Sequence, residues 1–128
     1  SVLLLPANGE TLLQRYNSTN HQIETLAART SRLAKVSANA RRYLPNADGT
    51  VLVFVADRAG PEAVYENSES LIWRDAGALL QTLAITATAY NLAFCPLGYL
   101  GLDAIQALGP TDKLLAVGSA VVGEIPPG

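Results

Sequence analysis

The alternation of apolar and polar positions predicts short strands before the first helix. Residues 2–5 form a continuous apolar run typical of a buried strand, and Asn8 with Gly9 supplies the positive φ angles of a tight turn. Two further segments of strand character, 12–16 and 22–26, are separated by four polar residues whose side chains favour turns. The first quarter of the chain is therefore expected to be a small β meander.

Helical spacing of apolar residues starts at residue 30. Over residues 30–43, Leu33, Val36 and Ala40 recur on one side while basic residues occupy the others, which predicts an amphipathic surface helix. The unbroken apolar run at 51–55 then predicts a strand that is buried on both faces. This strand is expected to be central to the sheet.

The dominant expected element is a long helix over residues 70–91, whose large apolar side chains cover nearly its whole circumference. No charged residue occurs between Asp75 and Asp103, and roughly 20 apolar residues suffice to cross a bilayer, so a transmembrane span is the alternative. Polar residues inside the window, the lack of aromatic belts and the lack of a lysine-rich flank argue against a membrane. A buried core or dimer-interface helix is therefore predicted.

The other expected elements are shorter: a helix at residues 61–65, an irregular turn at 95–98, a helix at 102–108 and a strand at 113–117. The two prolines and the glycine at 126–128 are expected to stop regular structure. Together the pattern predicts one α+β domain over residues 1–128, with a long buried central helix and a small, mainly antiparallel sheet.

Composition narrows the range of partners. Charged residues make up 16% of the chain, against about 25% in an average domain, so a second subunit is expected to cover part of its surface. The net charge of −2 and the absence of a basic stripe argue against nucleic acid. Cys95 and His21 are the only residues of their kinds, so neither an internal disulfide nor a zinc site is expected. A reducing, cytoplasmic setting fits this cysteine usage.

Several blocks of the sequence resemble the flavin-dependent nitroreductase superfamily. Residues 75–83 match its helix with an acid, small residues and a glutamine, Cys95-Pro96-Leu97-Gly98 matches its short turn, and 114–118 matches a strand that ends in Val-Gly. Upstream, Tyr16, His21 and Leu26 are similar to a hairpin of the branch that oxidises azoline rings in peptide natural products. The resemblance covers most of the chain.

This resemblance implies a nitroreductase-like fold that holds FMN at the interface of a homodimer or heterodimer formed through the helix at 70–91. The flavin would oxidise or reduce a small molecule or a peptide heterocycle, so a peptide is a possible substrate. In the family, amides after the proline point at the reactive edge of the flavin ring, and a glycine lets the backbone approach it. By position, the cofactor-binding residues would be Pro96, Leu97, Gly98, Tyr99 and, near the phosphate, Ser119.

The chain departs from the family pattern at three places. It starts downstream of the family's Arg-Ser-x-Arg helix, whose arginines bind the flavin phosphate, so a shortened domain is expected. The family's Lys-Tyr pair corresponds to Val64 and Tyr65, which leaves Tyr65 alone as the candidate catalytic proton donor. Ser119 stands where a basic phosphate ligand is usual. Two hypotheses remain: an FMN-dependent oxidoreductase, or a catalytically degenerate scaffold that binds a partner without flavin.

Overall fold

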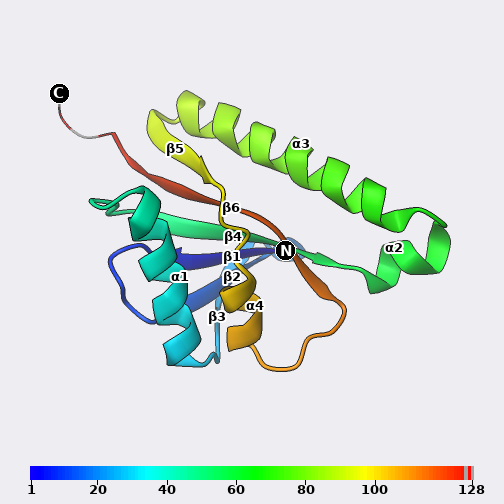
Figure 1. Cartoon of the computed structure of the whole chain (residues 1–128). Coiled ribbons are helices and arrows are strands. Elements are labelled where there is room, and N and C mark those ends of the chain that lie inside the picture. Colours follow the sequence, from blue (N-terminus) through cyan, green and yellow to red (C-terminus); the bar gives the residue numbers. More distant parts are fainter. Residues whose placement is uncertain (126, 128) are drawn as a thin grey trace.

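The computed structural model describes residues 1–125 and 127. Within them the chain forms six strands and four helices, arranged as a sheet with helices on both faces (Figure 1). In chain order the elements are β1 (Val2–Pro6), β2 (Leu13–Asn17), β3 (Gln22–Leu26), α1 (Thr30–Tyr43), β4 (Thr50–Asp57), α2 (Ala59–Val64), α3 (Ser68–Ala89), β5 (Leu92–Leu97), α4 (Leu102–Ala107) and β6 (Leu114–Glu124).

All strand pairs in the sheet are antiparallel, and the strand order is β3-β2-β1-β4-β6-β5. Strand β4 lies between β1 and β6, with Val53 opposite Leu3 on one side and opposite Ser119 on the other. Its residues 51–55 are buried, as the apolar run predicts. The two edge strands are β3 and β5.

Side chains that alternate along the strands build a separate apolar layer on each face of the sheet. On one face, Val51 and Val53 of β4 pack with Leu33 and Val36 of α1 and with Ile105 of α4, in the larger cluster. On the other face, the smaller cluster is formed around Leu52, Phe54 and Ala120, with partly buried leucines of α3 against it. Helices α1 and α4 therefore cover one face, and α3 runs across the other (Figure 1).

The prediction of a small sheet around a long buried helix is wrong. The sheet has six strands, and α3 lies on its outside with only Ile72, Ala76 and Ala87 buried. Ile85, which was expected to be buried, is 62% exposed. One sheet face can cover only one side of a helix, so the apolar residues around the rest of α3 remain exposed within a single chain.

Most predicted elements are present, and two differ. Strand β5 begins directly after the predicted helix and includes residues 95–97 of the expected irregular turn, and β6 continues past Gly118 to Glu124. The expected stop of regular structure falls on residues 126–128, of which only Pro127 is described. Over the described part of the chain, no helix has the length and hydropathy of a membrane span.

Candidate functional site

The predicted cofactor residues lie together where β5 ends and the chain bends toward α4. Pro96 and Leu97 are the last residues of β5, and Leu97 pairs with Ser119 of β6. Gly98 and Tyr99 follow in the bend. The structure thus places all five predicted cofactor residues in one region, although strand pairing alone accounts for the closeness of Leu97 and Ser119. Their assignment to flavin stays a prediction.

Gly101 fixes the bend against the centre of the sheet. Its φ of 92° is in the left-handed region that favours glycine, and a Cβ built there would lie 2.5 Å from Val53 Cγ1. Val53 is completely buried in β4. The backbone therefore approaches β4 as closely as a residue without a side chain permits, which sets the position of residues 98–100.

The bend offers backbone hydrogen-bond donors. Among the backbone hydrogen bonds of the described residues outside helices and strands, none begins at the amides of Gly98, Tyr99 or Leu100. Gly98 is exposed, and a Cβ added to it would meet no atom within 4 Å. A flat group with acceptor atoms along one edge can approach this backbone closely and accept from it.

The Tyr99 side chain is held by a chain of polar contacts. Its hydroxyl donates to Asp103 Oδ2 at 2.9 Å, and Asp103 Oδ1 accepts from Arg32 Nη1 at 3.2 Å. Burial, then the hydrogen bond to Asp103 and its negative charge, raise the pKa of Tyr99 above its ordinary value. Tyr99 therefore remains protonated and acts as a donor to Asp103, which links the bend to α4 and α1.

Ser119 of β6 holds the same bend through a hydrogen bond to its backbone. It is 1% exposed, and its hydroxyl donates to the carbonyl oxygen of Tyr99. The hydroxyl has a single proton, so this donor is already used inside the protein. Because Ser119 is buried and its donor is used, a phosphate could bind it only by displacing both the contact with Tyr99 and the residues that cover it.

The candidate catalytic residue Tyr65 lies in a different part of the molecule. It follows α2, where its amide donates to Pro61 O at 2.9 Å, and it is 56% exposed. Figure 1 shows α2 beside the start of α3, whereas β5 begins at the far end of that helix. The neighbouring Val64 is 72% exposed, so the structure places neither side chain in the bend at residues 98–100.

The sequence did not identify Arg32 and Asp103 as part of this region. They are 71 positions apart, and only the packing of α1 against α4 brings them together. Asp103 could have been noticed as the first charge after a long uncharged segment. In the described residues, no group of three or more His, Cys, Asp and Glu side chains could hold a metal ion.

The electrostatic character of the bend limits what it can bind. From residue 76 to residue 102 the chain has no charged side chain, and the nearest charged pair beyond, Asp103 with Arg32, is already mutually neutralised. Such a region suits the uncharged acceptor edge of a ring better than a phosphate.

No protein-family model matches the chain, and no curated protein matches it.

Proposed function

We propose that the chain is one subunit of a homodimer that binds FMN beside residues 96–99 and acts as an oxidoreductase on a small molecule or a peptide heterocycle. The observation that supports this most directly is that no backbone acceptor is found, among the described residues, for the amides of Gly98, Tyr99 and Leu100, next to the exposed α-carbon of Gly98. The motif resemblance of residues 75–83 and 95–98 to flavin enzymes points to the same ligand.

The chemistry divides between the cofactor and the chain. Bound flavin would supply the two-electron transfer. Amides at the bend would stabilise negative charge that develops at the ring edge, because preorganised backbone donors need no reorientation during reaction. Arg32, the cation linked to this bend through Asp103 and Tyr99, is already paired with Asp103 at 3.2 Å, so we expect the residue that binds the flavin phosphate to come from a second chain. The expected setting is the reducing cytoplasm, as the lone Cys95 suggests.

The outward side of α3 has the properties of a surface that a second copy covers. Hydroxyls of Thr82, Thr86 and Thr88 donate to carbonyl oxygens one turn earlier, at 2.8, 2.7 and 3.1 Å. Burying these threonines therefore leaves no hydroxyl donor unpaired. Ile85 lies exposed among them, and Arg74 and Asp75 are the only charges after the first turn of α3.

A second copy is the partner that this surface favours. A different protein would be selected by complementary charge, and the exposed side of α3 has almost none. A twofold dimer instead brings one surface against itself, which a weakly charged helix allows without repulsion between like charges. The dimer would also supply the second chain that the flavin phosphate requires.

A dimeric scaffold without flavin is the second candidate. It is favoured by the hydroxyls of Ser119 and Tyr99, because both donate to other groups of the protein and neither proton is left for a ligand. It is also favoured by the position of Tyr65 after α2, whereas the bend follows β5, which begins at the other end of α3 (Figure 1). The same helix surface would form the dimer. The two candidates therefore differ only in whether the bend binds a ligand.

Titration of the purified protein with FMN, followed by quenching of flavin fluorescence, distinguishes these candidates. Gly98→Val adds a side chain at the bend, and Gly60→Val is the matched control, since a Cβ built at either glycine meets no atom within 4 Å. We expect saturable binding by the unmodified chain and by Gly60→Val, and a loss of at least roughly tenfold in affinity for Gly98→Val. Absence of saturable binding by the unmodified chain would leave the scaffold as the function.

A further inference from the structure

Strand β5 ends the sheet with an edge that no other described strand pairs with. Natural edge strands are usually protected by charged side chains, and β3 at the opposite edge follows this rule: its Glu24 pairs with Arg15 at 2.7 Å. Residues 92–97 contain no charged side chain. An unprotected edge of this kind is a template for another strand.

The direction of the backbone groups in β4 fixes which groups of β5 are free. Ser1 N donates to Val55 O at 2.8 Å and Val55 N donates to Ser1 O at 2.9 Å, so this pair exchanges both hydrogen bonds across β1 and β4. Hydrogen-bonded and non-hydrogen-bonded pairs alternate along an antiparallel ladder. The backbone N–H and C=O groups of residues 51 and 53 therefore also point to β1, and those of Thr50 and Leu52 point to β6.

The alternation continues through β6 to the edge. Thr50 and Leu52 are paired with residues 122 and 120, so the residues between and beyond them, Val121 and Gly123, direct their backbone groups to β5. Their partners there are Cys95 and Ala93. The amides and carbonyls of Leu92 and Phe94, and the carbonyl of Pro96, consequently point outward. Proline has no N–H, and position 96 is one at which the ladder within the sheet needs none.

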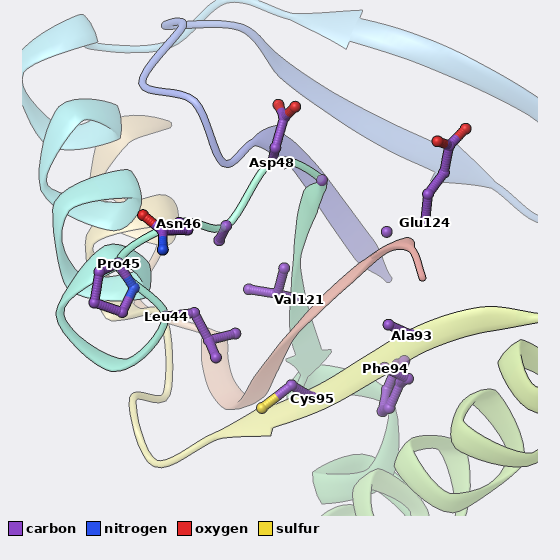
Figure 2. A pocket seen from close by; sticks show the side chains of 12 residues that line it. Leu44, Pro45, Asn46, Asp48, Ala93, Phe94, Cys95, Val121 and Glu124 are labelled. Atoms are coloured by element: carbon purple, nitrogen blue, oxygen red, sulfur yellow. The ribbon is translucent and has the colours of Figure 1, made fainter. Parts of the chain in front are cut away.

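A groove lies beside this edge on the α1 face. It has a volume of about 460 Å³ and is enclosed by residues 44–49 on one side and by Ala93 and Cys95 on the other, with Val121 at its floor (Figure 2). Ala93 and Cys95 are small, so they leave the groove open toward the edge. A side chain from a strand added to β5 can therefore pass over them into the groove.

The charges of the groove select the side chain that enters. Asp48 and Glu124 line it, both are exposed, and Figure 2 shows their carboxylates at the same end. No Lys, Arg or His is among the lining residues. A lysine or arginine matches this groove, because its methylene stem can cover apolar surface while its charged end reaches the carboxylates.

The α3 face beside the edge is apolar. A smaller hollow of about 170 Å³ is lined there by Leu92, Phe94 and the end of α3, including Leu83 and Tyr90. Successive residues of a strand point to opposite faces, so a bound strand would direct alternate residues to this hollow and to the acidic groove. The site therefore favours a strand that alternates apolar residues with a central basic residue.

We propose that the outer edge of β5 binds an extended peptide as a seventh strand, with a Lys or Arg side chain directed to Asp48 and Glu124. Main-chain hydrogen bonds to Leu92 and Phe94 provide affinity, and the groove provides selectivity. The peptide is proposed to contact Leu92, Phe94 and the groove, and neither these two residues nor the groove lining belongs to the bend proposed to bind FMN. Peptide binding and flavin binding are therefore measured separately, and the failure of one does not decide the other.

Fluorescence anisotropy with a labelled Thr-Val-Lys-Val-Thr peptide tests the proposal. Two related peptides serve as controls: one has Glu in place of Lys, and one has both valine nitrogens methylated, which removes the donors that pair with the edge. We expect saturable binding of the first peptide and at least roughly fivefold weaker binding of each control. Equal binding of all three peptides, or no binding of the first, would overturn the proposal.

Variants of the protein locate the site. Asp48→Asn with Glu124→Gln should weaken binding roughly threefold to tenfold, since two exposed ion pairs are lost, whereas Glu66→Gln with Asp112→Asn changes the charge equally and should have no effect. Ala93→Lys should abolish binding, and Ala63→Lys, at an exposed position of α2, should not. If Ala93→Lys instead converts a dimer into monomers, the occupant of this edge is a second copy and the peptide proposal is wrong.

Discussion

Replacement of Gly101 by alanine tests how the bend is fixed to the sheet. The new Cβ would lie 2.5 Å from Val53 Cγ1 and 3.0 Å from Val53 Cγ2, and Val53 cannot move aside because it is completely buried. A residue other than glycine at φ 92° also loses about 1 to 2 kcal/mol to backbone strain. Overpacking of a core costs a further 1 to 3 kcal/mol, roughly, so Gly101→Ala should destabilise the fold by about 2 to 5 kcal/mol.

Two other glycines separate these contributions. Gly109 has a φ of 109° but no atom within 4 Å of a built Cβ, so Gly109→Ala should cost only the backbone strain of about 1 to 2 kcal/mol. Gly98 has neither a positive φ nor a close neighbour, and Gly98→Ala should change stability by less than about 1 kcal/mol.

Urea unfolding followed by circular dichroism measures all three variants, at one protein concentration because association would add to apparent stability. The free energy of unfolding should fall least for Gly98→Ala, more for Gly109→Ala and most for Gly101→Ala. If Gly101→Ala is no more destabilising than Gly109→Ala, the close approach of the bend to Val53 does not exist in solution.

Two further substitutions probe the polar contacts of the bend. Tyr99→Phe removes the hydroxyl that donates to Asp103 and should lower the free energy of unfolding by about 1 to 2 kcal/mol at neutral pH. The pKa of Tyr99 is higher in the folded protein than the ordinary 10.0, so the stabilisation by this hydroxyl is complete below pH 10 and declines above it. The stability difference between the two proteins should therefore shrink in urea titrations at alkaline pH, and a constant difference would contradict this role. Ser119→Ala leaves the Tyr99 carbonyl without its buried donor and should lower the free energy of unfolding in urea by about 1 to 2 kcal/mol. Ser18→Ala, at an exposed turn, is the control and should change the free energy of unfolding little. Equal effects of the two substitutions would show that the buried contact contributes nothing.

Local pattern predicted most elements but not the second edge strand. The motif Cys95-Pro96-Leu97-Gly98 suggested an irregular turn, and no element was predicted between the helix at 70–91 and this turn. Asn91 was the available signal, since asparagine tolerates the left-handed conformation that ends helices, and its φ is 56°. Likewise, the β-branched Val121 and Val122 after Gly118 favour a continued strand.

Contacts between distant segments were outside the reach of the sequence pattern. Nothing in the spacing of Arg32 and Asp103 connects them, because the contact depends on how α1 and α4 share one face of the sheet. The apolar residues of α3 predicted a buried helix, but burial within the chain did not follow from them. Periodicity reports that a surface favours burial, and it does not report which molecule provides the cover.

Sedimentation equilibrium of the purified chain tests the central claim most directly, namely that α3 forms a dimer that could complete a flavin site. The account predicts a mass twice the 13.5 kDa of one chain, which Ile85→Glu reduces to the mass of a single chain while Glu66→Gln does not. A mass of 13.5 kDa at every concentration, or an unchanged dimer for Ile85→Glu, would contradict it.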